Sequence, residues 1–299
     1  MTRPCRIGVQ LPEVERAVAW PELFAMARAV EAVGLDSLWL GDHLLYDDLP
    51  GGVTRGPWEV WTSLAAIAAV TERVEIGPLV ASTSFHAPAM LAKQAATVDA
   101  ISGGRLVLGL GAGWNEREYR AFGFPFDRRV SRFAEAFTII RTLLSEGRVD
   151  FHGEFYDVDD CVLDPGPVRP GGVPLMLGST GPRMLGIGLP HVASWNAWWS
   201  QYGNTPEGFA TLKRRVDALG HPAEATAAVL VAFPGGQGRV MGDSDYRSPV
   251  RPVQGTPEQI AGHLAAMAGA GATHLQLVLD PITQESIEKL GDVLAILDR

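Results

Sequence analysis

The stretch Gly103-Gly-Arg-Leu-Val-Leu-Gly-Leu-Gly-Ala-Gly-Trp-Asn-Glu116 decides the fold that we predict for this chain. It begins as an apolar strand, in which the three leucines share one parity while Gly109, Gly111 and Gly113 share the other. Because successive side chains on a strand point to opposite faces, one face should be leucine and the other almost bare. A bare face lets a flat ligand approach the main chain, so we expect a cofactor here. A face packed by side chains would contradict that placement.

The same alternation of strand and helix surrounds this stretch. Apolar periodicity predicts helices at Trp20–Val33, Glu59–Val70 and Pro88–Ile101, each followed by a short apolar strand. Eight strands are predicted in all, near residues 7, 38, 76, 107, 175, 193, 229 and 276. Eight strand–helix units predict an α/β fold of the TIM (β/α)8 barrel type. Residues 1–299 are expected to form this barrel as a single domain. A doubly wound parallel sheet is the alternative.

Two insertions interrupt the repeat. After a helix at Arg132–Leu144, residues Val149–Val158 read as a β-hairpin that turns at His152-Gly153, before the fifth strand. Gly235–Gln254 has no periodicity, and this long loop precedes the eighth strand. A loop of that length inside a compact domain is usually a lid or disordered.

Composition excludes several classes of protein. The chain is 46% hydrophobic with a net charge of −9 and no cluster of Lys or Arg, which argues against nucleic acid or a membrane as a partner. No apolar stretch is long enough to span a bilayer. With two cysteines and no paired His or Cys spacing, neither a disulfide framework nor a metal site is expected. We therefore expect a cytoplasmic protein that binds a small molecule.

Candidate chemistry gathers where the predicted strands end, because barrel active sites lie at that face. Asp42-His43 follow the second strand, and histidine is the usual proton donor or acceptor near neutral pH. A structural histidine that caps a loop would show the same pattern. His86 follows the third strand and reads as structural. Several tryptophans, Trp198 among them, fall near strand ends and line a pocket or pack in the core.

Two glycine-rich segments could bind phosphate. Gly109–Gly113 is not a dinucleotide fingerprint, because Trp114 stands where the third glycine belongs. Gly178-Ser-Thr-Gly-Pro-Arg183 joins a strand to a helix, so its backbone N–H groups, two hydroxyls and one arginine could cradle a phosphate. An ordinary helix cap would read the same way.

These motifs together resemble those of the bacterial luciferase-like oxidoreductases. The resemblance rests on Gly34–His43, Gly103–Glu116 and Gly178–Arg183, with Arg132–Glu135 and Gly255–Glu258 in the expected order, and it covers nearly the whole chain. It implies a TIM barrel with insertions, often dimeric, so a homodimer is expected. One departure is Val192-Ala-Ser-Trp-Asn196, where many relatives have Ala-Asp-Gly-Trp-Asn.

The resemblance also implies a cofactor. Members bind FMN or the deazaflavin coenzyme F420, and Asp42-His43 looks like the F420 branch. The implied function is hydride transfer between the deazaflavin C5 and a small organic substrate, with His43 as acid/base and Asp42 assisting. The alternatives are an FMN-dependent monooxygenase and a non-catalytic F420- or flavin-binding protein. The implied cofactor contacts, with a cis peptide expected within Pro78–Ala81, are Leu79, Val80, Gly111, Ala112, Gly113, Glu116, Gly178, Ser179, Thr180, Gly181 and Arg183.

Overall fold

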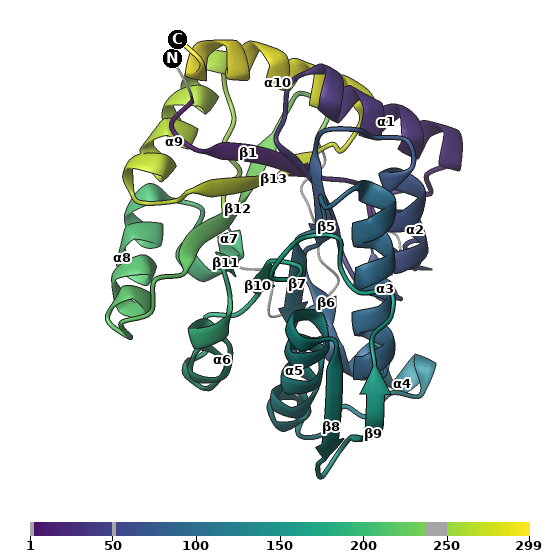
Figure 1. Ribbon diagram of the computed structural model, residues 1–299. Coiled ribbons are helices and arrows are strands. Elements are labelled where there is room, and N and C mark those ends of the chain that lie inside the picture. Colours follow the sequence, from purple (N-terminus) through teal and green to yellow (C-terminus); the bar gives the residue numbers. More distant parts are fainter. Residues whose placement is uncertain (1–2, 50–51, 237–249) are drawn as a thin grey trace.

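Parallel strands form the centre of the molecule, with helices packed around them (Figure 1). The computed structural model describes residues 3–49, 52–236 and 250–299. The strands of the main sheet are β1 (Arg6–Gln10), β2 (Ser37–Leu40), β5 (Glu75–Pro78), β6 (Ala81–Ser82), β7 (Leu108–Gly111), β10 (Leu175–Leu177), β11 (Ser194–Ala197), β12 (Glu224–Ala232) and β13 (His274–Asp280). Their order in the sheet is β5-β2-β1-β13-β12-β11-β10-β7-β6.

The sheet returns on itself at β5 and β6, which are successive parts of one chain segment. β5 pairs with β2 while β6 pairs with β7, and an isolated parallel bridge joins Ile76 to Leu106. Eight chain segments therefore build a nearly closed barrel. The TIM-barrel prediction is confirmed, and the doubly wound alternative is wrong because an open sheet would leave its two edge segments far apart.

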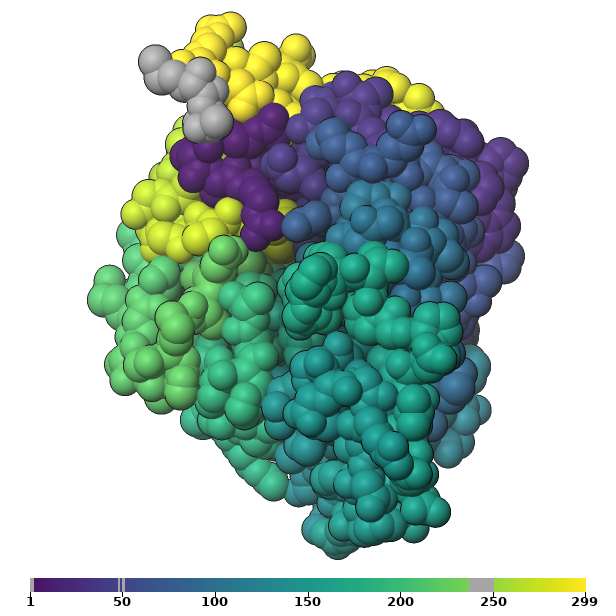
Figure 2. All heavy atoms as spheres, viewed as in Figure 1, coloured from purple at the N-terminus to yellow at the C-terminus, as the bar shows by residue number. Residues whose placement is uncertain are grey.

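The helices cover the outside of the barrel and largely match the predicted ranges. Figure 1 shows α1 and α10 along one end and α8 and α9 on the side opposite α2 and α3. The same view drawn as spheres shows the purple and yellow parts of the chain packed together along that end (Figure 2). Their bounds are α1 (Trp20–Ala32), α2 (Val60–Ala68), α3 (Pro88–Ser102), α4 (Glu116–Phe122), α5 (Arg129–Glu146), α6 (Pro182–Gly188), α7 (Trp199–Tyr202), α8 (Pro206–Asp217), α9 (Pro257–Gly269) and α10 (Gln284–Leu297). None of the described helices is both long and apolar enough to cross a membrane.

Two hairpins stand outside the barrel. The predicted one consists of β8 (Arg148–His152) and β9 (Asp157–Val162), and its pairing of His152 with Asp157 confirms the predicted turn region. The other, formed by β3 (Tyr46–Leu49) and β4 (Val53–Arg55), was not predicted, because its strands are very short and mix apolar with charged residues in no clear alternation. The long loop predicted at Gly235–Gln254 lies mostly outside the described residues.

The interior of the barrel has an apolar part and a polar part. Trp39, Leu79 and Met176 form a buried apolar cluster. Away from the mouth, Ser37 on β2 lies 2.7 Å from Nε2 of His274 on β13. Gly8 on β1 leaves the space for this pair, because a Cβ at Gly8 would lie 1.8 Å from the Ser37 hydroxyl oxygen.

Candidate functional site

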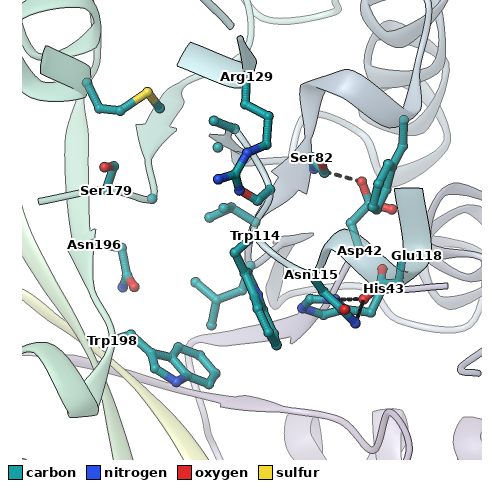
Figure 3. A pocket seen from close by; sticks show the side chains of 18 of the residues that line it. Asp42, His43, Ser82, Trp114, Asn115, Glu118, Arg129, Ser179, Asn196 and Trp198 are labelled. Carbon is teal, nitrogen blue, oxygen red and sulfur yellow. Dashed lines mark hydrogen bonds and ion pairs between the residues drawn. The ribbon is translucent and has the colours of Figure 1, made fainter. Parts of the chain in front are cut away.

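A cavity of about 340 Å³ opens at the carboxyl ends of the barrel strands (Figure 3). Five strands bring residues to it: β2, β6, β7, β10 and β11 all end at its wall. Its size lies at the lower end of the range for small-molecule sites. Nine of the residues singled out from the sequence line it, namely Asp42, His43, Leu79, Val80, Gly111, Ala112, Gly113, Gly178 and Ser179.

The wall beside β7 differs from the bare face expected from the sequence. The Leu79–Val80 peptide is cis, as expected, and the Val80 side chain lies against the glycines. A Cβ would come within 2.8 Å of Val80 at both Gly109 and Gly111, and within 2.5 Å at Gly178. The expectation of an empty glycine face is therefore wrong, and with it the placement of a cofactor directly on that face of β7. The glycines make room for Val80, and a ligand would meet Leu79, Val80 and the main chain of Gly111–Gly113 instead.

His43 is held by a glutamate from α4, the helix that follows β7. Its Nδ1 donates to Oε1 of Glu118 on α4 over 2.9 Å, and the Glu118 side chain is fully buried. The other carboxylate oxygen, Oε2, accepts from the Leu44 backbone N–H at 3.0 Å, and the Asn115 amide donates to Oε1. Three donors thus fix the carboxylate, which in turn fixes the orientation of the imidazole.

The surroundings of His43 favour its protonated form. Burial lowers the pKa of the imidazole, but the hydrogen bond and charge of Glu118, together with the charges of Glu13 and Asp42, raise it above the ordinary value of 6.5. Because Nδ1 is engaged by Glu118, Nε2 is the ring nitrogen that can exchange a proton with a ligand in the cavity.

Asp42 is buried at the base of the same wall. Its Oδ2 accepts from the Ser82 backbone N–H and from Nε2 of His86, each over 2.9 Å. Figure 3 shows Asp42 and His43 on the same side of the cavity, with Ser82 beside Asp42. His86, interpreted as structural from the sequence, therefore orients Asp42. One carboxylate oxygen is committed to this support, and the other is left for a ligand.

Four other predicted contacts lie beyond the cavity wall. Glu116 is the first residue of α4, is exposed, and lies 3.8 Å from Arg120 in an ion pair. Thr180 and Gly181 follow the cavity residue Ser179, and Gly181 caps α6. Arg183 is exposed on α6 and donates to the Ser131 hydroxyl over 2.8 Å. Their roles in cofactor binding stay predictions.

Glu118 and Arg129 line the cavity but were not predicted as site residues from the sequence. Asn115 is the N-cap of α4 and Glu118 is its third helical residue, the spacing of a capping box. That pattern would have predicted a short helix and turned attention from Glu116 to Glu118. Arg129, at the start of α5, lines the cavity and donates to the Gly113 carbonyl over 2.7 Å. No local pattern sets it apart from the neighbouring arginines.

The opposite wall comes from β11 and the segment after it. Figure 3 shows Asn196 and Trp198 facing the side that carries Asp42 and His43, with Trp114 between them. The Val192–Asn196 sequence differs from the Ala-Asp-Gly-Trp-Asn pattern at Val192 and Ala193, which precede β11, and at Ser194, which begins that strand. All three lie toward the other end of the strand from the cavity, so the departure leaves the lining residue Asn196 in place.

Outside the cavity, one group of side chains in the described part of the chain could approach a metal ion. Asp150, His152 and Asp159 on the β8–β9 hairpin have ligand atoms within 4.8 Å of one another, but all three are exposed. His152 is already paired with Asp150 and Asp157.

Comparison with known proteins finds a family model and several curated proteins that match this chain. The luciferase-like monooxygenase family model matches residues 6–234. An F420-dependent glucose-6-phosphate dehydrogenase of Amycolatopsis mediterranei is 36% identical over 166 residues, 54% of this chain and 48% of that protein. The pyrimidine monooxygenase RutA of Escherichia coli is 35% identical over 164 residues, 53% of this chain and 44% of that protein. The matched part thus spans about half the length of these curated relatives.

Solved structures share the fold over the full chain. An F420-dependent secondary alcohol dehydrogenase, solved with an F420–acetone adduct, superposes with a TM-score of 0.76 at 20% identity and covers 100% of both chains. The F420-dependent tetrahydromethanopterin reductase of Methanopyrus kandleri gives 0.76 at 16% identity and covers 98% of this chain and 99% of that one. Since the family model covers most of the barrel, this chain belongs to the luciferase-like monooxygenase family.

Proposed function

We propose that this protein is an F420-dependent oxidoreductase that transfers a hydride between the deazaflavin C5 and a small organic substrate. The observation that carries the proposal is the pairing of His43 with buried Glu118 at the wall of a cavity whose adjoining wall is Leu79 and Val80. A proton-transfer group beside an apolar wall suits hydride chemistry, in which a proton and a hydride move separately.

The residues present suit a planar cofactor with a polar edge. Leu79 and Val80 offer an apolar surface, and the positions of Gly111 and Gly178 bring backbone close to it. Asp42, Ser82 and His43 supply polar groups along the adjacent edge. This combination of one apolar face and one hydrogen-bonding edge is what a tricyclic deazaflavin or flavin requires.

When bound, the deazaflavin supplies the two-electron hydride chemistry. The chain's own residues orient the reactants and manage the proton. Nε2 of His43 gives or takes the proton of the substrate group that changes oxidation state, while Glu118 stabilises the imidazolium that forms. Asp42, held by His86 and the Ser82 N–H, orients the polar edge of the cofactor. Trp114, beside the His43 ring, and Trp198, on the facing wall, restrict the access of water to the cavity.

The anionic end of the cofactor needs positive groups. We place it near Gly178, Ser179, Thr180, Gly181 and Arg183, following the sequence prediction, with Glu116 at the rim of the ring site. Arg129 supports this direction, because no other arginine of the described residues lines the cavity and it lies between Ser179 and Ser82 in Figure 3. The chain is further proposed to act as a homodimer, which sedimentation of the purified protein can test.

An FMN-dependent monooxygenase is the second candidate. It is favoured by the match to pyrimidine monooxygenase RutA, which is about as similar as the F420-dependent relative. The cavity described above would accommodate either ring system. A monooxygenase would consume oxygen with reduced FMN, whereas the proposed enzyme would not need oxygen.

A titration of tryptophan fluorescence with F420 and with FMN, side by side, tests the proposal. Trp114 and Trp198 line the cavity, so either cofactor should quench the fluorescence when it binds. We expect tight binding of F420 and weak binding of FMN. Tight binding of FMN alone would overturn the assignment of the cofactor. Binding of F420 without turnover across a broad panel of alcohols, aldehydes and enones would instead favour a non-catalytic F420-binding protein.

A further inference from the structure

The amide of Asn196 is fixed by its neighbours in the barrel. Its Nδ2 donates to the Thr226 hydroxyl oxygen on β12 over 2.9 Å and to Oε1 of Gln276 on β13 over 2.8 Å. Asn196, Thr226 and Gln276 are all buried. An amide nitrogen carries two hydrogens, and both are used by these bonds. The side chain therefore has no donor left for a ligand.

The direction of these hydrogen bonds follows from Thr226. Its hydroxyl oxygen also lies 3.1 Å from the Trp195 carbonyl, an atom that can only accept, so the hydroxyl proton is directed there. The hydroxyl must then accept from Asn196. Reversing the Asn196 amide would place its oxygen against the Thr226 hydroxyl oxygen and against Oε1 of Gln276. The single Thr226 proton could serve either this oxygen or the Trp195 carbonyl, so two hydrogen bonds would be lost. One would still be lost if the Gln276 amide turned as well, and such a loss in a buried position is costly.

Oδ1 of Asn196 is consequently an acceptor without a partner among the described residues. Asn196 lines the cavity on the wall opposite His43 (Figure 3). Behind it, Nε2 of fully buried Gln276 has no hydrogen-bond partner either. Gln276 does not line the cavity, so Oδ1 of Asn196 is the atom of this pair that faces a ligand there.

We propose that Asn196 is a specificity-determining residue that selects substrates bearing a hydrogen-bond donor, such as a hydroxyl group, over substrates that lack one. A hydroxyl gives its single proton to Asn196 Oδ1. The substrate class is therefore an alcohol or polyol whose hydroxyl faces Asn196. Ethers and esters of the same shape, which lack the donor, are discriminated against because Oδ1 would lose its exposure to water without gaining a bond.

This inference rests on the proposed function in one respect: it takes the molecule that donates to Asn196 to be the substrate of the hydride transfer. A donor on the cofactor would satisfy Asn196 equally well. The experiment therefore measures binding rather than turnover and keeps the two sources apart. The probes are matched pairs: cyclohexanol with methoxycyclohexane, and benzyl alcohol with benzyl methyl ether. Each is titrated into the full-length protein, with and without saturating F420, while tryptophan fluorescence is followed.

In the wild-type protein, each alcohol is expected to bind about three- to tenfold more tightly than its methyl ether, the contribution of one neutral hydrogen bond. Asn196→Asp keeps an acceptor oxygen and should keep the preference, whereas Asn196→Leu should lose it. Melting temperatures verify that each variant is folded.

Equal binding of alcohol and ether, the same preference in Asn196→Leu, or no binding by any probe would overturn the proposal. A loss of F420 affinity in Asn196→Leu with an unchanged alcohol preference would assign the donor to the cofactor and also overturn it. A wild-type protein that prefers alcohols but binds no F420 would contradict the proposed function and leave the selection by Asn196 supported.

Discussion

Two histidines stand near the two ends of the barrel and differ in what surrounds them. His43, at the mouth, donates to a buried glutamate, and three carboxylates raise its pKa against the effect of burial. His274, inside the barrel away from the mouth, faces the Ser37 hydroxyl, and burial together with the charge of Arg6 lowers its pKa to about 3. The imidazole of His43 thus favours the protonated state at one end of the barrel, and the imidazole of His274 stays neutral at the other.

The partner atoms explain the contrast. The Trp39 indole N–H donates to the Ser37 hydroxyl oxygen over 2.7 Å, so the hydroxyl gives its own proton to Nε2 of His274. That bond needs an unprotonated nitrogen. At the mouth the partner is a carboxylate, which can only accept and therefore favours a charged ring. Burial alone does not determine the role of a histidine; the kind of atom it faces does.

The largest effect is expected from His43→Ala. If His43 transfers the substrate proton, the variant should lose about 10²- to 10⁴-fold in turnover, the usual contribution of a general acid or base. F420 affinity should stay nearly unchanged, since the apolar wall of Leu79 and Val80 remains. Steady-state kinetics and the fluorescence titration measure the two quantities. His221→Ala, at an exposed position, serves as control, and full activity of His43→Ala would remove this residue from the mechanism.

At the other end, Ser37→Ala should affect stability instead of activity. The substitution leaves the Trp39 N–H and the His274 ring without their shared partner inside the barrel, at a cost of about 1–3 kcal/mol per unsatisfied group. Urea unfolding followed by circular dichroism measures the loss, with exposed Ser145→Ala as the matched control. A stability equal to that of the control would show that the two hydrogen bonds contribute little.

Glu118→Gln should make the surroundings of His43 more like those of His274, which has no carboxylate as its hydrogen-bond partner. Removing the carboxylate charge lowers the pKa of His43, so the pH profile of turnover should move to lower pH, with a loss of about tenfold at neutral pH. Nuclear magnetic resonance of the imidazole carbons follows the titration directly. An exposed glutamate far from the cavity, Glu285, can be changed to Gln for comparison. An unmoved titration of His43 would contradict the role of Glu118.

The smallest effect is the pH dependence of folding that comes from His274. Its pKa is about 3 in the folded state against 6.5 ordinarily, so the unfolded chain binds more protons between these values and stability falls as the pH is lowered through that window. The contribution is at most about 1.4 kcal/mol per pH unit. His274→Gln should reduce this slope in urea unfolding at pH 4 to 6, and an identical slope would refute it. His43 acts in the opposite sense, since its raised pKa contributes stability below pH 6.5 that is lost as the pH rises.

Much of the fold followed from local patterns. Apolar periodicity located the main helices within a few residues, and α3 begins at Pro88 as predicted. The eight barrel segments were each placed, because a buried parallel strand is a short apolar run. The β3–β4 hairpin and α4 were missed, since short polar elements have weak periodicity and depend on contacts made elsewhere in the chain.

The candidate site was only partly visible in the sequence. Asp42 and His43 stood out as polar residues after an apolar strand, whereas Glu118 comes from a helix that follows β7, far away along the chain. The glycines of β7 suggested open space, but Val80 from the neighbouring segment fills it. Asn196 was noticed only as part of a motif, because its unused oxygen depends on bonds from β12 and β13.

The sequence by itself determined the repeating strand–helix units, the face of the barrel that carries polar residues, and the glycines whose backbone other groups can approach closely. These depend on local periodicity and on the small size of particular residues. Tertiary structure alone decided which histidine meets a carboxylate, which meets a hydroxyl, and which amide keeps an oxygen free. Hydrogen bonds and charges act over a few ångströms in space, so they follow the closure of the barrel and not the order of the chain.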